Sequence, residues 1–369
     1  MRCSFMEVDL NNYDYNMDQI RKYVGNDMPI MPVIKANCYG TWINRLNEVI
    51  EKFDIVAVAL VSEAVKLRKQ GFSKEIFVLN QPDVGDISDI IENNITVGAS
   101  DKRFIEKLGE TNKEVNIHIE IDSGMGRTGI KPEEIVDFIN KIKLYNNIKV
   151  EGIYTHLSSA DYDMEYTNNQ FEKFDFCVKK AKELLGDLKY IHSSASNGIL
   201  NFPEKKYSLV RAGIIMYGYP SFDTTYEKID LKPVCKLKSK ITFLKEVEPG
   251  TSISYSRRFI TSRKTKVATI PIGYADGIRR ELINGGEVVI NGVKAPIIGT
   301  VCMDSFMVDV TEIENVEVGT EVYIWDNDII TLEEIAEKCG TINYEIMSQI
   351  SERVPRVFIK DGKRVKIYE

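Results

Sequence analysis

The sequence has few of the features that mark membrane, secreted or nucleic-acid-binding proteins. No apolar run approaches the roughly 18 residues that a membrane span needs, and the first ten residues, MRCSFMEVDL, contain no long apolar segment typical of a signal peptide. The six cysteines are scattered without a CxxC pair, which is typical of reduced thiols in a cytoplasm and not of a disulfide framework. The three histidines, His118, His156 and His192, show no ligand-like clustering, so we expect no zinc site. The net charge of −7, without a basic block, argues against a nucleic-acid partner.

Strand-like and helix-like segments alternate over residues 28–218. Eight short apolar runs are separated by amphipathic stretches, which is typical of parallel strands joined by helical crossovers. Eight such units in roughly 190 residues favour a (β/α)8 barrel over a doubly wound sheet. The predicted strands are Ile30–Ala36, Asp54–Leu60, Glu75–Leu79, Ile95–Val97, Val115–Ile121, Ile148–Tyr154, Tyr190–Ser194 and Leu209–Arg211.

Residues after about 230 show a different pattern. Alternating polar and apolar residues are separated by turn pairs such as Asn291-Gly292 and Asp361-Gly362, which are typical of antiparallel hairpins. Two short helices are predicted near Leu332–Lys338 and Tyr344–Ile350. We therefore predict an α/β protein with a TIM-like (β/α)8 barrel over residues 11–228. A mostly antiparallel β domain follows over residues 229–369, and we assign the N-terminal strand, residues 1–10, to that domain.

A lysine closes the first predicted barrel strand, within the stretch MPIMPVIKANCYGTW. Because lysine is rarely buried without a partner, Lys35 either extends to the rim of the barrel or serves as an amine of lowered pKa, as in Schiff-base chemistry. In such barrels the chemistry lies at the carboxyl ends of the strands, where Tyr39, His156, Ser196 and Arg211 are also expected. Together they supply an amine, an aromatic platform, backbone donors for an anion and a permanent cation, which are the components of a cofactor site.

A series of motifs extends this pattern along almost the whole chain. The motifs are VIKANCYG (33–40), DSGMGRTG (122–129), YTHLSSAD (154–161), HSSASNG (192–198), VRAGIIMYG (210–218), SISYS (252–256), IPIGYADGIRR (270–280), GTVCMDSFMVDV (299–310) and TINYE (341–345). In these motifs and their order the chain resembles the alanine racemases, a family that uses pyridoxal phosphate on a barrel-plus-β-domain fold.

The resemblance implies an activity and a role for each matching residue. It implies that L- and D-alanine are interconverted by two-base proton transfer on a pyridoxal 5'-phosphate aldimine, which Lys35 forms. Lys35 and Tyr255 would be the two catalytic bases. The implied cofactor-binding residues are Lys35, Tyr39, His156, Ser196, Arg211, Gly213, Ile214 and Tyr344; Arg127 and Met303 would place the substrate carboxylate; His192 would support Arg211, and Asp161, Tyr274, Arg280, Ile342 and Tyr344 would form the substrate entrance.

The chemistry requires this arrangement for reasons independent of the family. Racemisation removes the α-proton from one face of a planar carbanion and returns a proton to the other face, so it needs a base on each face. Arg211 stays protonated and donates to the cofactor's ring nitrogen, which disfavours a pyridinium there. We expect this to weaken the electron sink and to discourage side reactions.

Two positions depart from the family pattern. The family usually carries a carbamylated lysine where this chain has Glu120, two residues before Asp122. Our hypothesis is that Glu120 supplies a similar negative charge beside Arg127; the alternative is an ordinary exposed strand glutamate. Thr300 stands where an arginine is common, near the expected substrate entrance. This second departure leaves serine, or a broader range of amino acids, open as a substrate.

Three other classes of protein share parts of the pattern. Residues 124–129 satisfy GxGxxG, with Glu151 further on, as in NAD-dependent oxidoreductases. However, the next helix is predicted to begin at Pro132, beyond the third glycine, where its N-terminus cannot hold a pyrophosphate. A non-catalytic vitamin B6 carrier would lack the β domain with Tyr255 and Met303. A related decarboxylase would use a partner cysteine and a glycine-rich phosphate loop, and the spacing here does not reproduce them.

The resemblance also implies a cellular setting. It implies a cytoplasmic homodimer with shared active sites, in which Tyr255 of one chain enters the barrel of its partner. The implied pathway role is the supply of D-alanine for cell-wall peptidoglycan. We expect a small amino acid as the substrate, and neither a membrane nor a nucleic acid as a partner.

Overall fold

The chain folds into two compact units in the computed structural model, which describes residues 2–219 and 228–368. The barrel unit comprises Tyr15–Cys38 and Ile43–Leu231, and the β unit comprises Met1–Asp14, Tyr39–Trp42 and Lys232–Glu369. None of the described helices combines the length and the apolar character that a membrane span requires.

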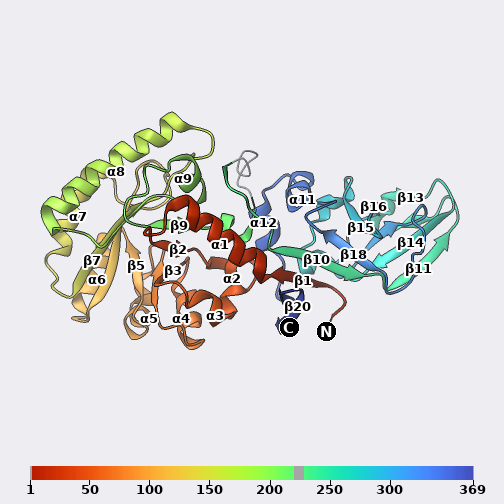
Figure 1. The fold of residues 1–369 in the computed structure, drawn as a ribbon, viewed down its shortest axis with the longest axis horizontal. Coiled ribbons are helices and arrows are strands. Elements are labelled where there is room, and N and C mark those ends of the chain that lie inside the picture. Colours follow the sequence, from red (N-terminus) through yellow and green to blue (C-terminus); the bar gives the residue numbers. More distant parts are fainter. Residues whose placement is uncertain (1, 220–227, 369) are drawn as a thin grey trace. The chain divides into compact units, whose positions relative to one another are not determined.

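Eight parallel strands form the centre of the barrel unit (Figure 1). Strands β3 to β8 form one sheet in chain order, and β2 pairs with β9. A bridge between Val33 and Ala57 links β2 to β3, and the Arg211 N–H donates to the Ser194 carbonyl at 3.0 Å, which links β8 to β9 and closes the ring. The strands are β2 (Ile30–Pro32), β3 (Ile55–Val58), β4 (Glu75–Val78), β5 (Thr96–Ala99), β6 (Val115–Ile121), β7 (Ile148–Thr155), β8 (Tyr190–His192) and β9 (Val210–Ala212). The (β/α)8 barrel predicted from the sequence is confirmed.

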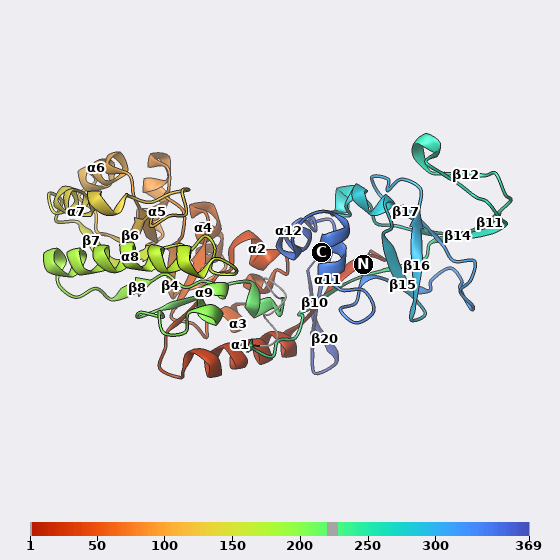
Figure 2. The same cartoon turned by 90° about the horizontal axis from the view of Figure 1, so that it is seen from above.

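Helices cover the outside of these strands (Figures 1 and 2). They pack through apolar residues at helical spacing; in α6, for example, Phe104, Ile105 and Leu108 are buried. The strands, covered on one side by helices and filled by side chains on the other, are apolar over nearly their whole length. The main covering helices are α4 (Val61–Lys69), α5 (Ile87–Glu92), α6 (Lys102–Glu110), α7 (Ile135–Ile142) and α8 (Met164–Leu185), and α1 (Leu10–Val24) precedes the first barrel strand.

The β unit is built on a ten-stranded, mostly antiparallel sheet. Its order is β11-β14-β17-β16-β15-β18-β10-β1-β19-β20, and β1 pairs antiparallel with β10 and parallel with β19. The Asn291-Gly292 pair, with φ of 50° and 77°, joins β15 to β16 in the left-handed conformation that tight hairpins require. The strands are β1 (Phe5–Asp9), β10 (Cys235–Lys240), β11 (Phe243–Val247), β14 (Thr265–Ile270), β15 (Glu287–Ile290), β16 (Val293–Ile298), β17 (Phe306–Asp309), β18 (Glu321–Trp325), β19 (Arg356–Lys360) and β20 (Lys363–Tyr368).

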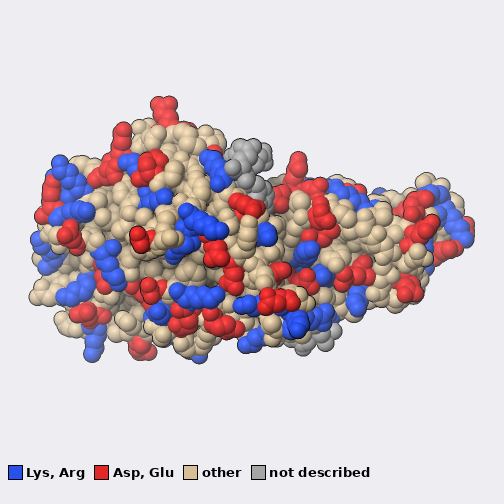
Figure 3. Space-filling view, viewed as in Figure 1, with Lys and Arg blue, Asp and Glu red and all other residues tan. Residues whose placement is uncertain are grey.

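Two helices and a separate ribbon complete the β unit. Helix α11 spans Leu332–Lys338, as the sequence predicts, and α12 spans Asn343–Ser348. Strands β12 (Ser252–Ile253) and β13 (Phe259–Ile260) pair only with each other and form a loop that projects from this unit in Figure 2. On the face shown in Figure 3, basic and acidic side chains are interspersed over both units.

Candidate functional site

Lys35 stands at the start of a left-handed turn that follows β2. The strand ends at Pro32, earlier than the predicted Ala36, because the residues after Lys35 leave the extended conformation. Ala36 to Tyr39 all have φ between 50° and 55°, and none of them is glycine. Such residues cost roughly 1–2 kcal/mol each in the left-handed region, so the turn needs support. Glu63 in α4 provides part of it, since its Oε1 accepts the N–H of Ala36 at 2.6 Å.

The Lys35 amine has the electrostatic character of a base. Burial lowers its pKa below the usual value, and the positive charges of Arg127 and Arg211 lower it further, whereas the Glu63 carboxylate raises it. The net shift increases the fraction of unprotonated amine at neutral pH. An amine in that state can act as a nucleophile or accept a proton.

Arg211, on β9, is 2% exposed and uses its two terminal nitrogens within the protein. Nη1 donates to Nδ1 of His192 at 2.8 Å and to the His192 carbonyl at 3.2 Å. Nη2 donates to the carbonyls of Thr155 and Ser193 at 2.9 and 2.8 Å, and lies 3.2 Å from Nδ1 of His156. Among the described residues nothing accepts from Nε–H. Burial lowers the pKa of Arg211 to about 10, so the guanidinium remains a cation at neutral pH.

The structure brings the three histidines together, although their positions in the sequence show no cluster. Nδ1 of His118 lies 2.9 Å from Nε2 of His192, and Arg211 connects His192 to His156. Burial, and then the positive charge of Arg211, lower the pKa of His156 and of His192; for His118 burial is again the largest cause and lowers the pKa to about 3. All three rings are therefore neutral at pH 7.

Two short helices begin side by side next to this network. Ser196 is the first residue of α9 (Ser196–Asn201), and Ile214 is the first residue of η4 (Ile214–Tyr217). The hydroxyl of Ser196 accepts the N–H of Gly213 at 3.3 Å, so the two starts are adjacent. Backbone N–H groups at the first turn of a helix have no partner within the helix and suit a phosphate.

Glu120 and Arg127 lie at the end of β6 and in the loop that follows. Glu120 is 3% exposed, so it is not the exposed strand residue of the alternative interpretation. Its Oε1 accepts from Thr128 Oγ1 at 2.8 Å, whereas Oε2 has no partner among the described residues. Burial raises the pKa of Glu120, and the Thr128 hydrogen bond and the Arg127 charge oppose the shift. Arg127 itself is exposed and makes no hydrogen bond or ion pair within the described part of the chain, which leaves its guanidinium available to a carboxylate.

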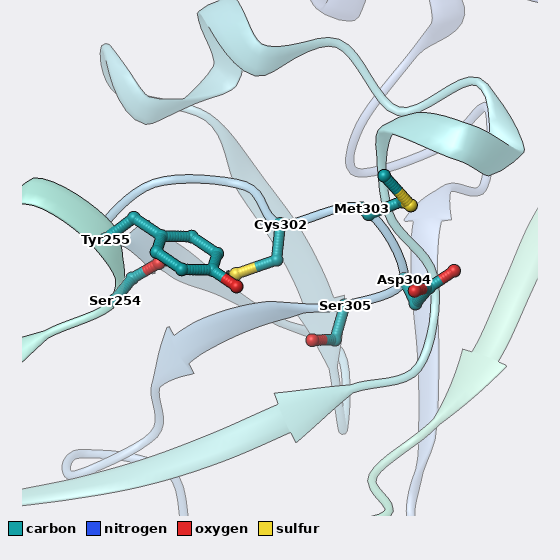
Figure 4. A pocket seen from close by; sticks show the side chains of 6 residues that line it. All are labelled: Ser254, Tyr255, Cys302, Met303, Asp304 and Ser305. Carbon is teal, nitrogen blue, oxygen red and sulfur yellow. Dashed lines mark hydrogen bonds between the residues drawn. The ribbon is translucent and has the colours of Figure 1, made fainter.

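Tyr255 and Met303 line a pocket of the β unit (Figure 4). Tyr255 begins η5 (Tyr255–Arg257) on the projecting ribbon and is 68% exposed, and Met303, between β16 and β17, is 51% exposed. Thr300 supports the backbone there, because its hydroxyl donates to the Tyr255 carbonyl at 3.1 Å. Ser254 donates in turn to the Thr300 carbonyl at 2.6 Å.

Tyr39 and Tyr344 form a second group in the β unit, with ring centroids 6.1 Å apart. Gly40 allows the turn that contains Tyr39 to pack closely against α12, because a Cβ at position 40 would lie 2.4 Å from the carbonyl oxygen of Met347 in that helix. The buried Arg356 fixes the same turn, since its Nε donates to the Gly40 carbonyl at 2.8 Å and its guanidinium carbon lies 4.3 Å from the Trp42 ring centroid.

The remaining predicted residues lie apart from these groups. Tyr274 and Arg280 line one shallow pocket of the β unit. Ile342 is 61% exposed. Asp161 lies in the loop between β7 and α8 of the barrel unit and bonds to no other predicted residue. The predicted site residues thus divide between a group around the buried Arg211 in the barrel unit, with the exposed Arg127 at its edge, and partly or fully exposed groups in the β unit.

Sequence reasoning missed three supporting residues, Glu63, His118 and Arg356. Glu63 occupies the third position of α4, where a glutamate often bonds backbone N–H groups at the start of a helix. Arg356 interrupts the apolar run VPRVF, and a lone arginine in such a run indicates a buried cation with partners. His118 lies in VNIHIEI, whose pattern does not show which ring it will meet.

Comparisons with known proteins agree along the whole chain. The family description "Alanine racemase, N-terminal domain" matches residues 8–221, and "Alanine racemase, C-terminal domain" matches residues 234–358. The alanine racemase of Halothermothrix orenii is 40% identical over 370 residues, covering 97% of this chain and 97% of its own. The solved alanine racemase of Clostridium difficile 630 matches with a TM-score of 0.95 and 35% identity, covering 99% of this chain and 98% of its own. That of Bacillus anthracis, solved with bound L-Ala-P, matches with a TM-score of 0.94 and 34% identity, covering 100% and 98%. The chain belongs to the alanine racemase family.

Proposed function

We propose that this chain interconverts L- and D-alanine, with pyridoxal phosphate held at the mouth of the barrel. The observation that carries the proposal is the donor set of Arg211. Protein acceptors occupy its terminal nitrogens, and the Nε–H of this buried cation has no partner among the described residues. The Lys35 amine, whose pKa Arg211 helps to lower, belongs to the same unit. This combination fits a ligand that carries both an aromatic nitrogen and an aldehyde.

The residues present fit the remaining parts of the cofactor. Ser196, Gly213 and Ile214 would hold its phosphate at the paired helix starts, and Tyr39 and Tyr344 are proposed as further phosphate contacts. His156, neutral and hydrogen-bonded to Arg211, would lie against the ring. When bound, pyridoxal phosphate supplies an aldehyde for an amine and a conjugated ring that stabilises negative charge at the α-carbon of the substrate.

Arg211 determines the protonation of the ring nitrogen in this proposal. Its pKa of about 10 keeps its protons on the guanidinium at neutral pH. It therefore donates a hydrogen bond to an aromatic nitrogen without transferring the proton. The nitrogen stays uncharged, and the range of reactions available to the substrate is narrower than with a pyridinium.

Lys35 and Tyr255 are the proposed bases on the two faces of the substrate. Lys35 holds or moves a proton at Nζ, and its lowered pKa makes this exchange easier near neutral pH. Tyr255 would act at its phenolic oxygen from the other face. Its 68% exposure on a projecting ribbon supports the proposal that it enters the barrel of a partner chain in a homodimer.

Glu120 is proposed to take the place of the family's carbamylated lysine. Its buried carboxylate lies within electrostatic range of Arg127 and would orient that guanidinium toward the substrate carboxylate. Removal of CO2 should then leave the activity unchanged. Glu120→Ala should raise the KM for alanine by about tenfold, as expected when a charge-assisted contact of about 1.4 kcal/mol is lost. A fully active Glu120→Ala variant would contradict this role.

Serine is the second candidate substrate, and the observation that favours it is Thr300. This residue, at the position where the family commonly has arginine, is buried and bonds to the backbone of Tyr255. An assay that resolves D and L products should be run with alanine, serine and larger amino acids. We expect alanine to give the highest kcat/KM; a higher value for serine would reassign the substrate.

Borohydride reduction tests the proposed cofactor chemistry directly. After reduction in the presence of pyridoxal phosphate, we expect a pyridoxyl mass increment on the peptide that contains Lys35. Lys35→Ala is the control and should carry no tag. A tag on another lysine, or no tag on the native chain, would refute the proposal.

A nicotinamide cofactor is not expected to bind to the glycine loop. The 3-10 turn η3 begins at Pro132, after the third glycine of the loop, so the glycines do not lead directly into a helix as a pyrophosphate-binding loop does. Titration with NADH should therefore neither quench the intrinsic fluorescence of the protein nor shift the emission of NADH.

The cellular setting is also a proposal. All six cysteines lie within the described residues and are free, which supports a reducing cytoplasm. As the resemblance implies, the D-alanine produced there would supply cell-wall peptidoglycan.

A further inference from the structure

A chain of buried groups runs from Arg211 across the interior of the barrel unit. Nη1 of Arg211 lies 2.8 Å from Nδ1 of His192, and Nε2 of His192 lies 2.9 Å from Nδ1 of His118. The next atom, Nε2 of His118, is completely buried and has no partner among the described residues. Two buried carboxylate oxygens, Glu75 Oε1 and Glu151 Oε2, also lack described partners. One ring nitrogen of His118 and one carboxylate oxygen from each of Glu75 and Glu151 lie within 4.8 Å of one another.

The guanidinium at one end determines the direction of every hydrogen bond. Arginine has no acceptor, so Nδ1 of His192 must accept. A neutral imidazole carries a single N–H, so the proton of His192 is on Nε2 and is donated to Nδ1 of His118. The proton of His118 is then on Nε2, where it faces the carboxylates of Glu75 and Glu151.

Packing fixes the planes of the two rings, and the hydrogen bonds to Arg211 and between the rings select which edge of each ring faces which neighbour. The His118 ring stacks on Phe77, with centroids 4.4 Å apart and planes at 28°. His192 stacks on Tyr154 at 5.1 Å and 5°. Gly152, on the neighbouring strand, makes room for His118, because a Cβ there would lie 2.9 Å from the imidazole carbons.

The direction of these hydrogen bonds also argues against a metal ion between His118, Glu75 and Glu151, even though one histidine and two carboxylates are a common ligand set. A metal needs the lone pair of Nε2, and the chain from Arg211 places a proton there. With the proton moved to Nδ1 of His118, that N–H would face the Nε2–H of His192; if His192 changed tautomer instead, its Nδ1–H would face the N–H of Arg211. The neighbouring Glu75 oxygen is already engaged, since Oε2 accepts from Lys189 at 3.0 Å and from the Tyr190 hydroxyl at 3.1 Å.

We propose that His118, with Glu75 and Glu151 at its outer side, is a positioning residue: by accepting the Nε2–H of His192 it holds that ring in the tautomer that accepts from Arg211, and so keeps the guanidinium in place. The hydrogen bonds of such a chain polarise and strengthen one another. Arg211 is thereby held in place with its Nε–H directed away from the protein acceptors. The catalytic meaning of this arrangement rests on the proposed function, whereas the tautomers themselves do not.

Histidine NMR tests the tautomers without any assay of activity. The chain has only three histidines, so the 15N-histidine-labelled full chain gives a small set of ring resonances, which His118→Phe and His156→Gln variants would assign. We expect each ring to be neutral at pH 7, with its proton on Nε2 and a bare Nδ1, both with and without pyridoxal phosphate. A proton on Nδ1 of His118 or His192, or an imidazolium, would overturn the proposal.

Zn²⁺ provides the test of the competing interpretation. Added to the labelled chain, it should leave the Nε2 resonance of His118 unchanged. A stoichiometric Zn²⁺-dependent shift of that resonance, abolished in Glu151→Gln, would replace the donor chain with a metal site.

Removing the charge of Glu151 tests whether the carboxylates beside His118 influence His192 and Arg211. Glu151→Gln should move the ring resonances of His118 and, less strongly, those of His192, and should lower kcat about three- to tenfold with little change in KM, the effect of one weakened hydrogen bond. Glu172→Gln, on the exposed face of α8, is the matched control and should match the native chain in every measurement. Unchanged His192 resonances and an unchanged kcat in Glu151→Gln would refute the coupling. The expected tautomers in a chain without racemase activity would contradict the proposed function alone.

Discussion

The two units hold their polar groups in opposite environments. In the barrel unit, Arg211, His192 and Glu120 are at most 3% exposed and are fixed by hydrogen bonds. In the β unit, the predicted site residues Tyr255 and Met303 are more than half exposed. The barrel unit is therefore preorganised before any ligand arrives, whereas the β unit presents side chains that suit a surface of another molecule. This difference is what a shared active site would require.

Mixed dimers test this comparison with the largest expected effect. Lys35→Ala and Tyr255→Phe should each reduce kcat by at least about 10³-fold, because each removes a proposed base. Co-refolded in equal amounts, the two variants should regain about one quarter of the native activity, since one site in each mixed dimer then has both bases. Each variant refolded alone is the control. No recovery after verified subunit exchange would contradict a Tyr255 supplied by the partner.

Gly40→Ala should damage the β unit specifically. The substitution places a Cβ 2.4 Å from the Met347 carbonyl at a φ of 87°, so we expect a loss of about 3 kcal/mol in the free energy of unfolding. Gly250→Ala is the matched control, because its φ is 83° and nothing lies within 4 Å of the added Cβ. It should cost only about 1 kcal/mol. Equal losses in urea unfolding would show that the contact with α12 has no effect.

Mild acid should weaken the barrel unit, which contains all the histidines. Their folded pKa values are lowered, so the unfolded chain binds more protons below pH 6.5 and stability falls as the pH drops. Each histidine should remove about 1.4 kcal/mol of stability one pH unit below 6.5. Amide hydrogen exchange between pH 7.5 and 5.5 should show protection lost from β6 to β9 before the β unit. Equal loss in both units would contradict this asymmetry. Glu120 and Glu151, whose pKa values are raised, act in the opposite direction at lower pH.

Glu63→Gln should give the smallest effect and tests how firmly Lys35 is held. Glutamine keeps an acceptor for the N–H of Ala36 but removes the negative charge that raises the Lys35 pKa. The alkaline limb of the pH profile of labelling at Lys35 by an amine reagent should therefore move to lower pH, with activity within about tenfold of the native value. Glu92→Gln, on the exposed end of α5, is the control. A shift to higher pH would contradict the electrostatic role of Glu63.

The strand pattern could be predicted because parallel strands in a barrel are apolar on both faces. Each of the eight runs stands out between polar helices, and β6 was predicted with its observed limits. Helix α1 was missed, since its buried face mixes Tyr13 and Asn16 with Ile20 and so hides the helical period. The N-terminal strand was assigned to the β domain, and the structure pairs it with β10 and β19.

The candidate site was predictable only where a motif marked it. Lys35 and Arg211 end predicted strands, and the fold places such residues at one rim. The histidine cluster could not be predicted, because side-chain direction within β6 and β8 determines which rings meet. The left-handed turn after Lys35 could not be predicted either, since its residues include alanine, cysteine and tyrosine, none of which is typical of positive φ.

That turn has a consequence for any redesign of this protein. Glycine at positions 36–38 would relieve the unfavourable torsions, so a redesign aimed only at stability would introduce glycine there. Glycine would also open many alternative conformations to the segment, whereas the L-residues present occupy the left-handed region at a cost and are kept there by contacts such as that of Glu63 with the Ala36 N–H. Such a redesign would lower the energy of the turn and, in the same step, loosen the backbone that positions the Lys35 amine.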